Sequence, residues 1–196
     1  MREFKIPRSP HEKGVILYKK SKMTLEPGVT VLVGCNGCGK STFVENIAKQ
    51  LERESIPCVT YNNLYDGGSR AREKAMFYSE MDLFATLFCS SEGEQIVANM
   101  GSCAKQIGQL ARENKDAKEL WILLDAVDSG LSIDNIVDVK EYLFKTVIEH
   151  NKDKDVYIVV SANEYEMCNG ENCFDVYNGK YIRFNDYNDY RQFILD

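Results

Sequence analysis

Residues 34–41 read Gly34-Cys35-Asn36-Gly37-Cys38-Gly39-Lys40-Ser41. The stretch fits the pattern G-x-x-x-x-G-K-[ST] at every fixed position. Such a loop needs glycine because consecutive backbone N–H groups converge on an anion only where no Cβ obstructs them. A β-branched run at 29–33 enters the loop, and a helical pattern that begins near residue 40 leaves it. The stretch therefore predicts a phosphate-binding loop between a strand and a helix.

Each part of this loop has an expected role. The backbone N–H groups cradle phosphate oxygens, and the following helix N-terminus adds partial positive charge. Lys40 reaches the β- and γ-phosphates, and the Ser41 hydroxyl ligates Mg²⁺. The residues expected to contact nucleotide here are Gly34, Asn36, Gly37, Cys38, Gly39, Lys40, Ser41 and Thr42.

Two cysteine pairs raise the question of metal or redox chemistry. Cys35 and Cys38 form a C-x-x-C, but the phosphate loop already accounts for both positions. Cys168 and Cys173 are interpreted as incidental loop thiols. With 7 cysteines, an odd number, we expect reduced thiols in a cytoplasmic protein.

Outside the loop, apolar runs alternate with helical patterns, which predicts an α/β fold. Apolar runs without alternation, at 120–124 and 156–160, are typical of strands buried on both faces. The remaining expected strands cover 4–6, 15–18 and 58–61, with a hairpin at 174–184. Helices are expected at 40–54, 70–88, 93–113, 134–150 and 186–194. The result is one domain over residues 1–196, with a mainly parallel sheet flanked by helices.

Composition limits the function classes. A chain of 196 residues, 44% apolar and 28% charged, is typical of a single globular domain. We find no run of 18 apolar residues, so no membrane partner or span is expected. A net charge of −6 argues against a surface that coats itself with nucleic acid. A specific protein or nucleic-acid partner remains open.

Asp125 is the expected second half of the metal site. It ends the apolar run 121–124, and a carboxylate at the carboxyl end of a buried strand can meet Mg²⁺ beside Ser41. Lys40 and Asp125 are therefore candidate catalytic residues, and Ser41 and Asp125 candidate Mg²⁺ ligands.

Two further segments give a family resemblance. Residues 125–132, Asp-Ala-Val-Asp-Ser-Gly-Leu-Ser, resemble the D-E-x-D-x-x-L-D stretch of SMC-type heads. The segment from Ser91 to Glu94 resembles the signature of ABC ATPases, although a plain capping box also fits it. The chain thus resembles a compact soluble ABC-type, SMC/Rad50-like ATPase head without a coiled coil. The resemblance implies ATP, Mg²⁺, a short N-terminal antiparallel strand layer and a reduced helical subdomain at about 64–92. It also implies a head-to-tail homodimer that sandwiches ATP, with Ser91 and Gly93 acting on the partner's nucleotide.

The chain departs from this family at two catalytic positions. Ala126 stands where the family has its catalytic Glu, and Ala162 where it has a phosphate-sensing His. We therefore expect slow hydrolysis. Asp128, Glu164 or Glu94 could supply the substitute base, and Asp128 is preferred; a loop-capping or dimer-contact role for Asp128 is the alternative. Asn163 is expected to hydrogen-bond phosphate or water.

Two further positions are assigned from the same resemblance. Tyr18 would stack on adenine, the alternative being an ordinary edge-strand tyrosine. Asn62 or Asn63 would replace the missing Q-loop glutamine. Three functions stay open at this point: a slow ATPase, an ATP-gated dimerising module with little hydrolysis, and a small-molecule kinase, which leaves the segments at 91–94 and 125–132 unexplained.

Overall fold

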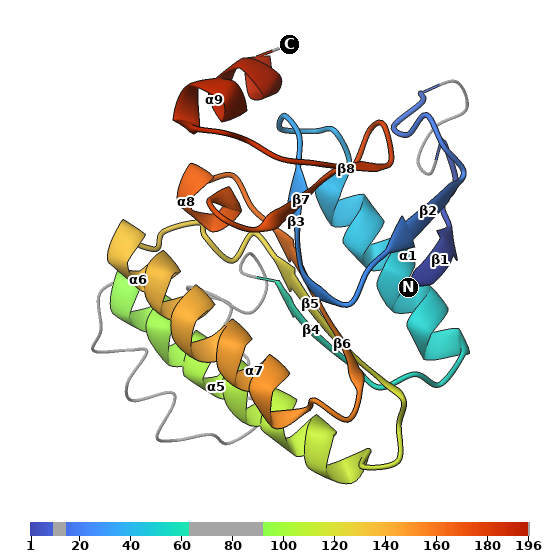
Figure 1. The fold of residues 1–196 in the computed structure, drawn as a ribbon, viewed down its shortest axis with the longest axis vertical. Helices are drawn as coiled ribbons and strands as arrows, with labels where there is room; N and C mark the ends of the chain where they lie inside the picture. The colour runs from blue at the N-terminus through green and yellow to red at the C-terminus, as the bar shows by residue number, and fades with distance from the viewer. Residues whose placement is uncertain (10–14, 63–91, 196) are drawn as a thin grey trace.

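A six-stranded sheet forms the centre of the computed structural model, which describes residues 1–9, 15–62 and 92–195 (Figure 1). The strand order is β4 (Cys58–Asn62), β5 (Glu119–Asp125), β6 (Asp155–Ser161), β3 (Gly28–Val33), β7 (Asn172–Asp175) and β8 (Lys180–Ile182). Neighbours from β4 to β7 run parallel, and β8 pairs with β7 antiparallel. This confirms the predicted α/β class with a mainly parallel sheet.

Helices cover both faces of the sheet (Figure 1). On one face lie α1 (Lys40–Arg53) and a separate antiparallel pair, β1 (Arg2–Lys5) with β2 (Lys22–Leu25). On the other face lie α5 (Glu92–Glu113) and a continuous helical segment made of α6 (Ile133–Asp138), a π-helical stretch η1 (Val139–Phe144) and α7 (Lys145–His150). The short α8 (Tyr165–Cys168) and the C-terminal α9 (Tyr187–Leu195) complete the described fold.

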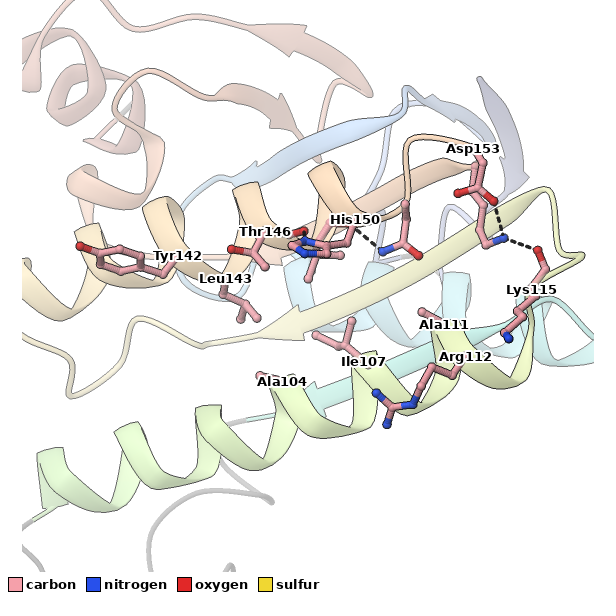
Figure 2. A pocket seen from close by; sticks show the side chains of 14 residues that line it. Ala104, Ile107, Ala111, Arg112, Lys115, Tyr142, Leu143, Thr146, His150 and Asp153 are labelled. Atoms are coloured by element: carbon pink, nitrogen blue, oxygen red, sulfur yellow. Dashed lines mark hydrogen bonds and ion pairs between the residues drawn. The ribbon is translucent and has the colours of Figure 1, made fainter.

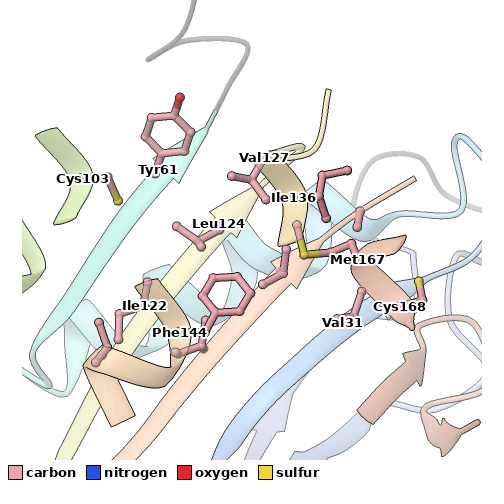
Figure 3. Packing of buried hydrophobic residues seen from close by; sticks show 14 of the residues in the cluster. Val31, Tyr61, Cys103, Ile122, Leu124, Val127, Ile136, Phe144, Met167 and Cys168 are labelled. Carbon is pink, nitrogen blue, oxygen red and sulfur yellow. The ribbon is translucent and has the colours of Figure 1, made fainter. Parts of the chain in front are cut away.

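The central strands bury side chains on both faces, as their unbroken apolar runs predict. In β3, Val31 and Val33 belong to the core beneath α5 and α6, whereas Leu32 belongs to the core beneath α1. Figure 3 shows the first of these cores, with Ile122 among the strand residues and Phe144 of η1 packed beside them. Because both faces of the sheet are covered, the strand ends are the places where polar side chains can meet a ligand.

A ring stack between two neighbouring strands helps to anchor the core under α1. Trp121 of β5 and Tyr157 of β6 stack with ring centroids 3.9 Å apart and an interplanar angle of 4°. Phe4 of β1 meets the Trp121 ring edge-on, with centroids 5.1 Å apart. The N-terminal strand pair is thereby fixed to the same sheet that carries the phosphate loop.

The sequence prediction was wrong at one strand. Residues 15–18 form no strand, and Val15 and Ile16 are exposed. The second strand of the N-terminal pair is instead β2, where Met23 and Leu25 are buried and alternate with exposed neighbours. The hairpin at 174–184 and the closing helix are confirmed, whereas the helix expected at 70–88 lies outside the described residues.

The strand order places the predicted site residues at one edge. β6 lies between β3 and β5, and its last residue Ser161 pairs in register with both Leu32 and Asp125. The loop that follows β3 and the carboxylate that ends β5 therefore lie together at the carboxyl ends of these parallel strands. Within the part of the chain that the structure describes, no helix is both long and apolar enough to cross a membrane.

Candidate functional site

The loop of residues 34–41 adopts a conformation that only glycine accommodates at several positions. Gly34, Gly37 and Gly39 have φ values of 146°, 82° and 98°. A Cβ on Gly34 would lie 2.5 Å from the Cys38 Sγ, and a Cβ on Gly39 would lie 2.8 Å from the Tyr18 hydroxyl oxygen. The glycines thus allow both the left-handed backbone and the close packing of the loop.

Helix α1 begins at Lys40, directly behind the loop, and its N-terminus is available for an anion. Gly39 is the N-cap, and no side chain caps the first turn. The backbone N–H groups of that turn have no partner within the helix, and they carry the positive end of the helix dipole. This arrangement suits a phosphate group.

The Lys40 ammonium folds back onto the loop. Its Nζ donates to the carbonyl oxygens of Gly34 at 2.6 Å and Cys35 at 3.3 Å, and the residue is 8% exposed. The ammonium therefore lies inside the ring of loop residues, where a bound anion would meet it. That the residues from Gly34 to Ser41 bind phosphate stays a prediction.

Tyr18 occupies a different environment from the one expected. It is fully buried, its hydroxyl donates to the Gly39 carbonyl at 2.7 Å, and its ring meets Phe43 edge-on at a centroid distance of 6.2 Å. A ring with no exposed face cannot stack on a base, so the structure contradicts the expected adenine contact. Tyr18 instead supports the phosphate loop from beneath.

Ser41 and Asp125 lie together, as the sequence predicts. The Ser41 Oγ donates to Oδ1 of Asp125 at 3.1 Å, and the Asn62 amide donates to Oδ2 at 2.8 Å. Asp125 is 3% exposed, and these two hydrogen-bond donors are neutral. A hydroxyl and a buried carboxylate side by side at the phosphate loop are the oxygen ligands that Mg²⁺ prefers, so these residues fit the ion.

Asp128 joins the loop after β5 to the loop after β6. Its Oδ2 accepts the backbone N–H groups of Asn163 at 2.5 Å and Glu164 at 2.6 Å. Its Oδ1 is buried and has no hydrogen-bond partner among the described residues. Burial raises the pKa of this carboxyl above its usual range, and the two N–H groups and the charge of Lys40 offset that rise only in part.

Ala126, Ala162 and Asn163, which the sequence singles out, lie near Asp128. Ala126 has a left-handed backbone with φ of 53°, and its N–H points to the Ser161 hydroxyl at 3.4 Å. Ala162 is buried. Asn163 is exposed, and its carbonyl accepts the Tyr190 hydroxyl of α9 at 2.6 Å. Neither alanine offers a group that can take a proton from water.

A cavity of about 730 Å³ opens beside the phosphate loop, on the side of β7, β8 and α9. Gly34, Cys35 and Cys38 form its wall toward the loop. Leu17, Tyr177, Phe184 and Phe193 give it apolar and aromatic surface. Its size and lining are those of a small-molecule site.

A second cavity, of about 790 Å³, lies away from this site between α5 and the helical segment η1–α7 (Figure 2). Its apolar wall comes from Ile107 and Leu143, and its rim carries Arg112, His150 and Asp153. Its lining includes no residue of the phosphate loop, so its size does not make it part of the candidate site.

The expected signature segment is described only in part. Ser91 and Asn63 lie outside the described residues, whereas Gly93 lies in the first turn of α5, which begins at Glu92. The contribution of Ser91 and Gly93 to a partner's nucleotide stays a prediction.

Sequence reasoning missed two supporting residues of the site. Ser161 ends β6 and accepts from the N–H of Ala126, and Tyr190 of α9 bonds to Asn163. The hydroxyl at the end of a buried strand was a usable signal for Ser161. Asn62 was considered only as a Q-loop substitute, and the structure adds its contact with Asp125.

The match to a family model agrees with an ATPase domain. The family model described as "ATPase family associated with various cellular activities (AAA)" matches residues 30–174. Among solved structures, the chain is similar to the ADP conformation of an ATP-binding cassette of an ABC transporter, with 14% identity and a TM-score of 0.44 over 89% of this chain and 86% of that one. No curated protein matches the chain.

Proposed function

We propose a specific activity for this chain within the ATPase family associated with various cellular activities (AAA), to which it belongs. It binds Mg-ATP at the loop of residues 34–41 and hydrolyses it slowly. One observation supports this most strongly: the Ser41 hydroxyl lies 3.1 Å from Oδ1 of Asp125, beside an uncapped helix N-terminus and a buried lysine. These four features together suit a metal-bound polyphosphate.

Phosphate binding would replace contacts that the loop now makes with itself. The Lys40 ammonium would exchange the carbonyl oxygens of Gly34 and Cys35 for β- and γ-phosphate oxygens. Since an anion interacts with an ammonium more strongly than a neutral carbonyl does, the exchange is favourable. The first-turn N–H groups of α1 would complete the cradle.

Ser41 and Asp125 would hold the magnesium ion. When bound, Mg²⁺ neutralises charge that develops on the phosphates during transfer. Asn62 fixes the orientation of the Asp125 carboxylate through Oδ2, which leaves Oδ1 directed at Ser41.

Hydrolysis is proposed to be slow because the usual proton acceptors are missing. Ala126 and Ala162 carry only methyl groups, and general-base help is typically worth ~10²–10⁴ in rate. Asp128 is the preferred substitute base, because it follows Asp125 at the end of the same strand and has a carboxylate oxygen with no partner among the described residues. Burial raises its pKa, which makes it a stronger base once ionised.

The nucleoside would lie in the cavity of about 730 Å³ rather than against Tyr18. The strand order supports this orientation of the nucleotide. Asp125, the proposed magnesium ligand, ends β5 on one side of β3, so the nucleoside would extend to the other side of β3, toward β7. Tyr177 and Phe193 offer aromatic surface to a base there.

A head-to-tail dimer is part of the same proposal. In it, Ser91 and Gly93 would face the γ-phosphate bound by a second copy. The position of Gly93 in the first turn of α5 supports this, because a helix N-terminus favours anions. Sedimentation with and without Mg-ATP checks it, and a monomer in both conditions would refute the dimer.

Calorimetry with Mg-ATP tests the function as a whole. Lys40→Ala should abolish measurable binding, because it removes the only cation that the described loop 34–41 directs inward. Lys49→Ala is the matched control, since this exposed lysine of the same helix only pairs with Glu45 at 3.7 Å. Equal affinity of the Lys40 variant and the unmodified chain would refute the proposed site.

A further inference from the structure

Cys35 and Cys38 lie at the two ends of a tight turn inside the phosphate loop. The Cys38 N–H donates to the Cys35 carbonyl at 3.2 Å, and Gly37 between them has φ of 82°. These are features of a type II β-turn, which brings its end Cα atoms within about 7 Å. A disulfide needs Cα atoms about 4.4–6.8 Å apart, so the turn holds the two residues at bridging range.

The two cysteines also share one opening. Both line the cavity of about 730 Å³ beside the loop, and both are free thiols. Cys35 is exposed, whereas Cys38 is half-buried with its Sγ against Gly34. An oxidant that enters the cavity would therefore reach Cys35 first and find Cys38 as the neighbouring thiol.

A shared metal ion explains the pair less well. Among the described residues, no group of three or more His, Cys, Asp or Glu side chains could hold a metal. A structural zinc site needs four such ligands. Two adjacent thiols without further ligands are instead the minimum for a dithiol–disulfide couple.

We propose that Cys35 and Cys38 are an oxidation site whose disulfide closes the phosphate loop to nucleotide. A hydroperoxide would oxidise the Cys35 thiolate to a sulfenic acid and be reduced to water or the alcohol. The Cys38 thiolate would then attack the Cys35 sulfur, form the S–S bond and release the sulfenic oxygen as water. A dithiol reductant reverses the step by thiol–disulfide exchange.

The consequence for nucleotide follows from what the two residues contact, and it rests on the function proposed above. To reach Cys35, the Cys38 Sγ must leave its position against Gly34, which changes the wall of the loop. The Cys35 carbonyl is also one of the two oxygens that hold Lys40 inside the loop. A crosslink across this turn would restrict the movement by which the N–H groups and Lys40 rearrange around phosphate.

The test oxidises the whole chain with hydrogen peroxide and measures three things. Peptide mapping should find a Cys35–Cys38 disulfide with the loss of two hydrogens, and ATP affinity should fall at least about tenfold. Dithiothreitol should reduce the disulfide to the two thiols and return ATP affinity to its starting value. Cys35→Ser should abolish the disulfide and make ATP affinity insensitive to peroxide. Cys58→Ser, a half-buried thiol of β4 outside the loop, should behave as the unmodified chain.

Each contrary outcome is distinct. No Cys35–Cys38 peptide, or a disulfide with unchanged ATP affinity, would overturn the proposal. Equal loss of affinity in Cys35→Ser and the unmodified chain would assign the effect to another oxidised residue and overturn it as well. If the reduced chain binds no ATP, the proposed function and the gating both fail, and the peptide map alone then decides whether the dithiol forms a disulfide.

Discussion

The side-chain amide of Asn62 donates a 2.8 Å hydrogen bond to Oδ2 of Asp125. The two residues end neighbouring parallel strands, β4 and β5, and are paired in register. Since Ser41 donates to the other carboxylate oxygen, the Asp125 side chain is fixed from both sides. Groups that orient a metal ligand in this way are usually worth ~10- to 100-fold in metal affinity or activity.

Asn62→Ala should therefore weaken the magnesium dependence of nucleotide binding. We expect a ~10- to 100-fold higher Mg²⁺ requirement for ATP binding, measured by calorimetry at a series of Mg²⁺ concentrations. Thr60→Ala is the control, because Thr60 is exposed on the same strand. An Asn62 variant with the Mg²⁺ requirement of the control would show that Asp125 needs no support.

The central strands of the sheet could be predicted because a strand buried on both faces has an uninterrupted apolar sequence. The runs at 120–124 and 156–160 are apolar at every position, as strands covered on both faces must be, and they became β5 and β6. The prediction of a strand at 15–18 was wrong because it took Val15 and Ile16 as buried residues, and both are exposed. That segment is positioned by a long-range contact from Tyr18 to the loop, which no local pattern reports.

Tyr18→Phe separates the structural role of this residue from base recognition. The variant keeps the ring but loses the hydrogen bond from the hydroxyl to the Gly39 carbonyl, which still accepts the Phe43 N–H at 2.8 Å. We therefore expect a loss of ~0.5–1.5 kcal/mol in the free energy of unfolding. The preference for ATP over inorganic triphosphate should not change. Urea unfolding measures the first effect and competition binding the second; a collapse of the preference would restore the stacking role.

Tyr177→Ala tests the nucleoside cavity directly. Removing an aromatic wall should weaken ATP binding by ~1–3 kcal/mol while leaving inorganic triphosphate binding unchanged, because the triphosphate has no base to stack. Tyr142→Ala, an exposed tyrosine of η1 in the distant cavity, is the control. Equal losses for ATP and triphosphate would place the fault in the phosphate loop instead.

Site residues could be predicted where the chemistry requires a fixed spacing along the sequence. Contacts between loops that are distant in the sequence could not, because they depend on the tertiary structure. Lys40 and Ser41 follow from the loop pattern, and Asp125 from the end of an apolar strand. The contact of Asp128 with Asn163 joins residues 35 positions apart. It exists because β5 and β6 are neighbours, which the sequence does not state.

Asp128→Asn should change stability in a pH-dependent way. Burial raises the pKa of Asp128 in the folded state, so the folded chain keeps a proton that the unfolded chain has already lost. The stability of the unmodified chain should then fall as pH rises from the pKa of Asp128 in the unfolded chain to its raised pKa in the folded chain. The variant lacks this loss. As pH rises above the ordinary pKa of an aspartate, about 4, the difference in unfolding free energy should shift in favour of the Asp128→Asn variant.

Urea unfolding of both chains across this pH series measures the difference. A flat difference, or a shift in favour of the unmodified chain, would mean that the two backbone N–H groups of Asn163 and Glu164 outweigh burial and keep the carboxyl ionised.

Ala126→Glu asks whether slow turnover has a single cause. Ala126 already has φ of 53°, so the left-handed backbone is accommodated by a residue with a Cβ, and glutamate adds no new strain of that kind. The new carboxylate would leave the same strand end as Asp125, next to the proposed magnesium ion. If a missing base limits the rate, phosphate release should rise by ~10²–10⁴.

The matched control is Ala126→Gln, which has the same size and no proton-accepting carboxylate. Steady-state phosphate release from both variants is compared after subtracting that of Lys40→Ala. A rise confined to glutamate assigns the slow rate to the missing base at position 126. Equal rates for glutamate and glutamine, with activity abolished by Asp128→Asn, would instead assign the base to Asp128, because its buried carboxylate would then already supply what the glutamate could add.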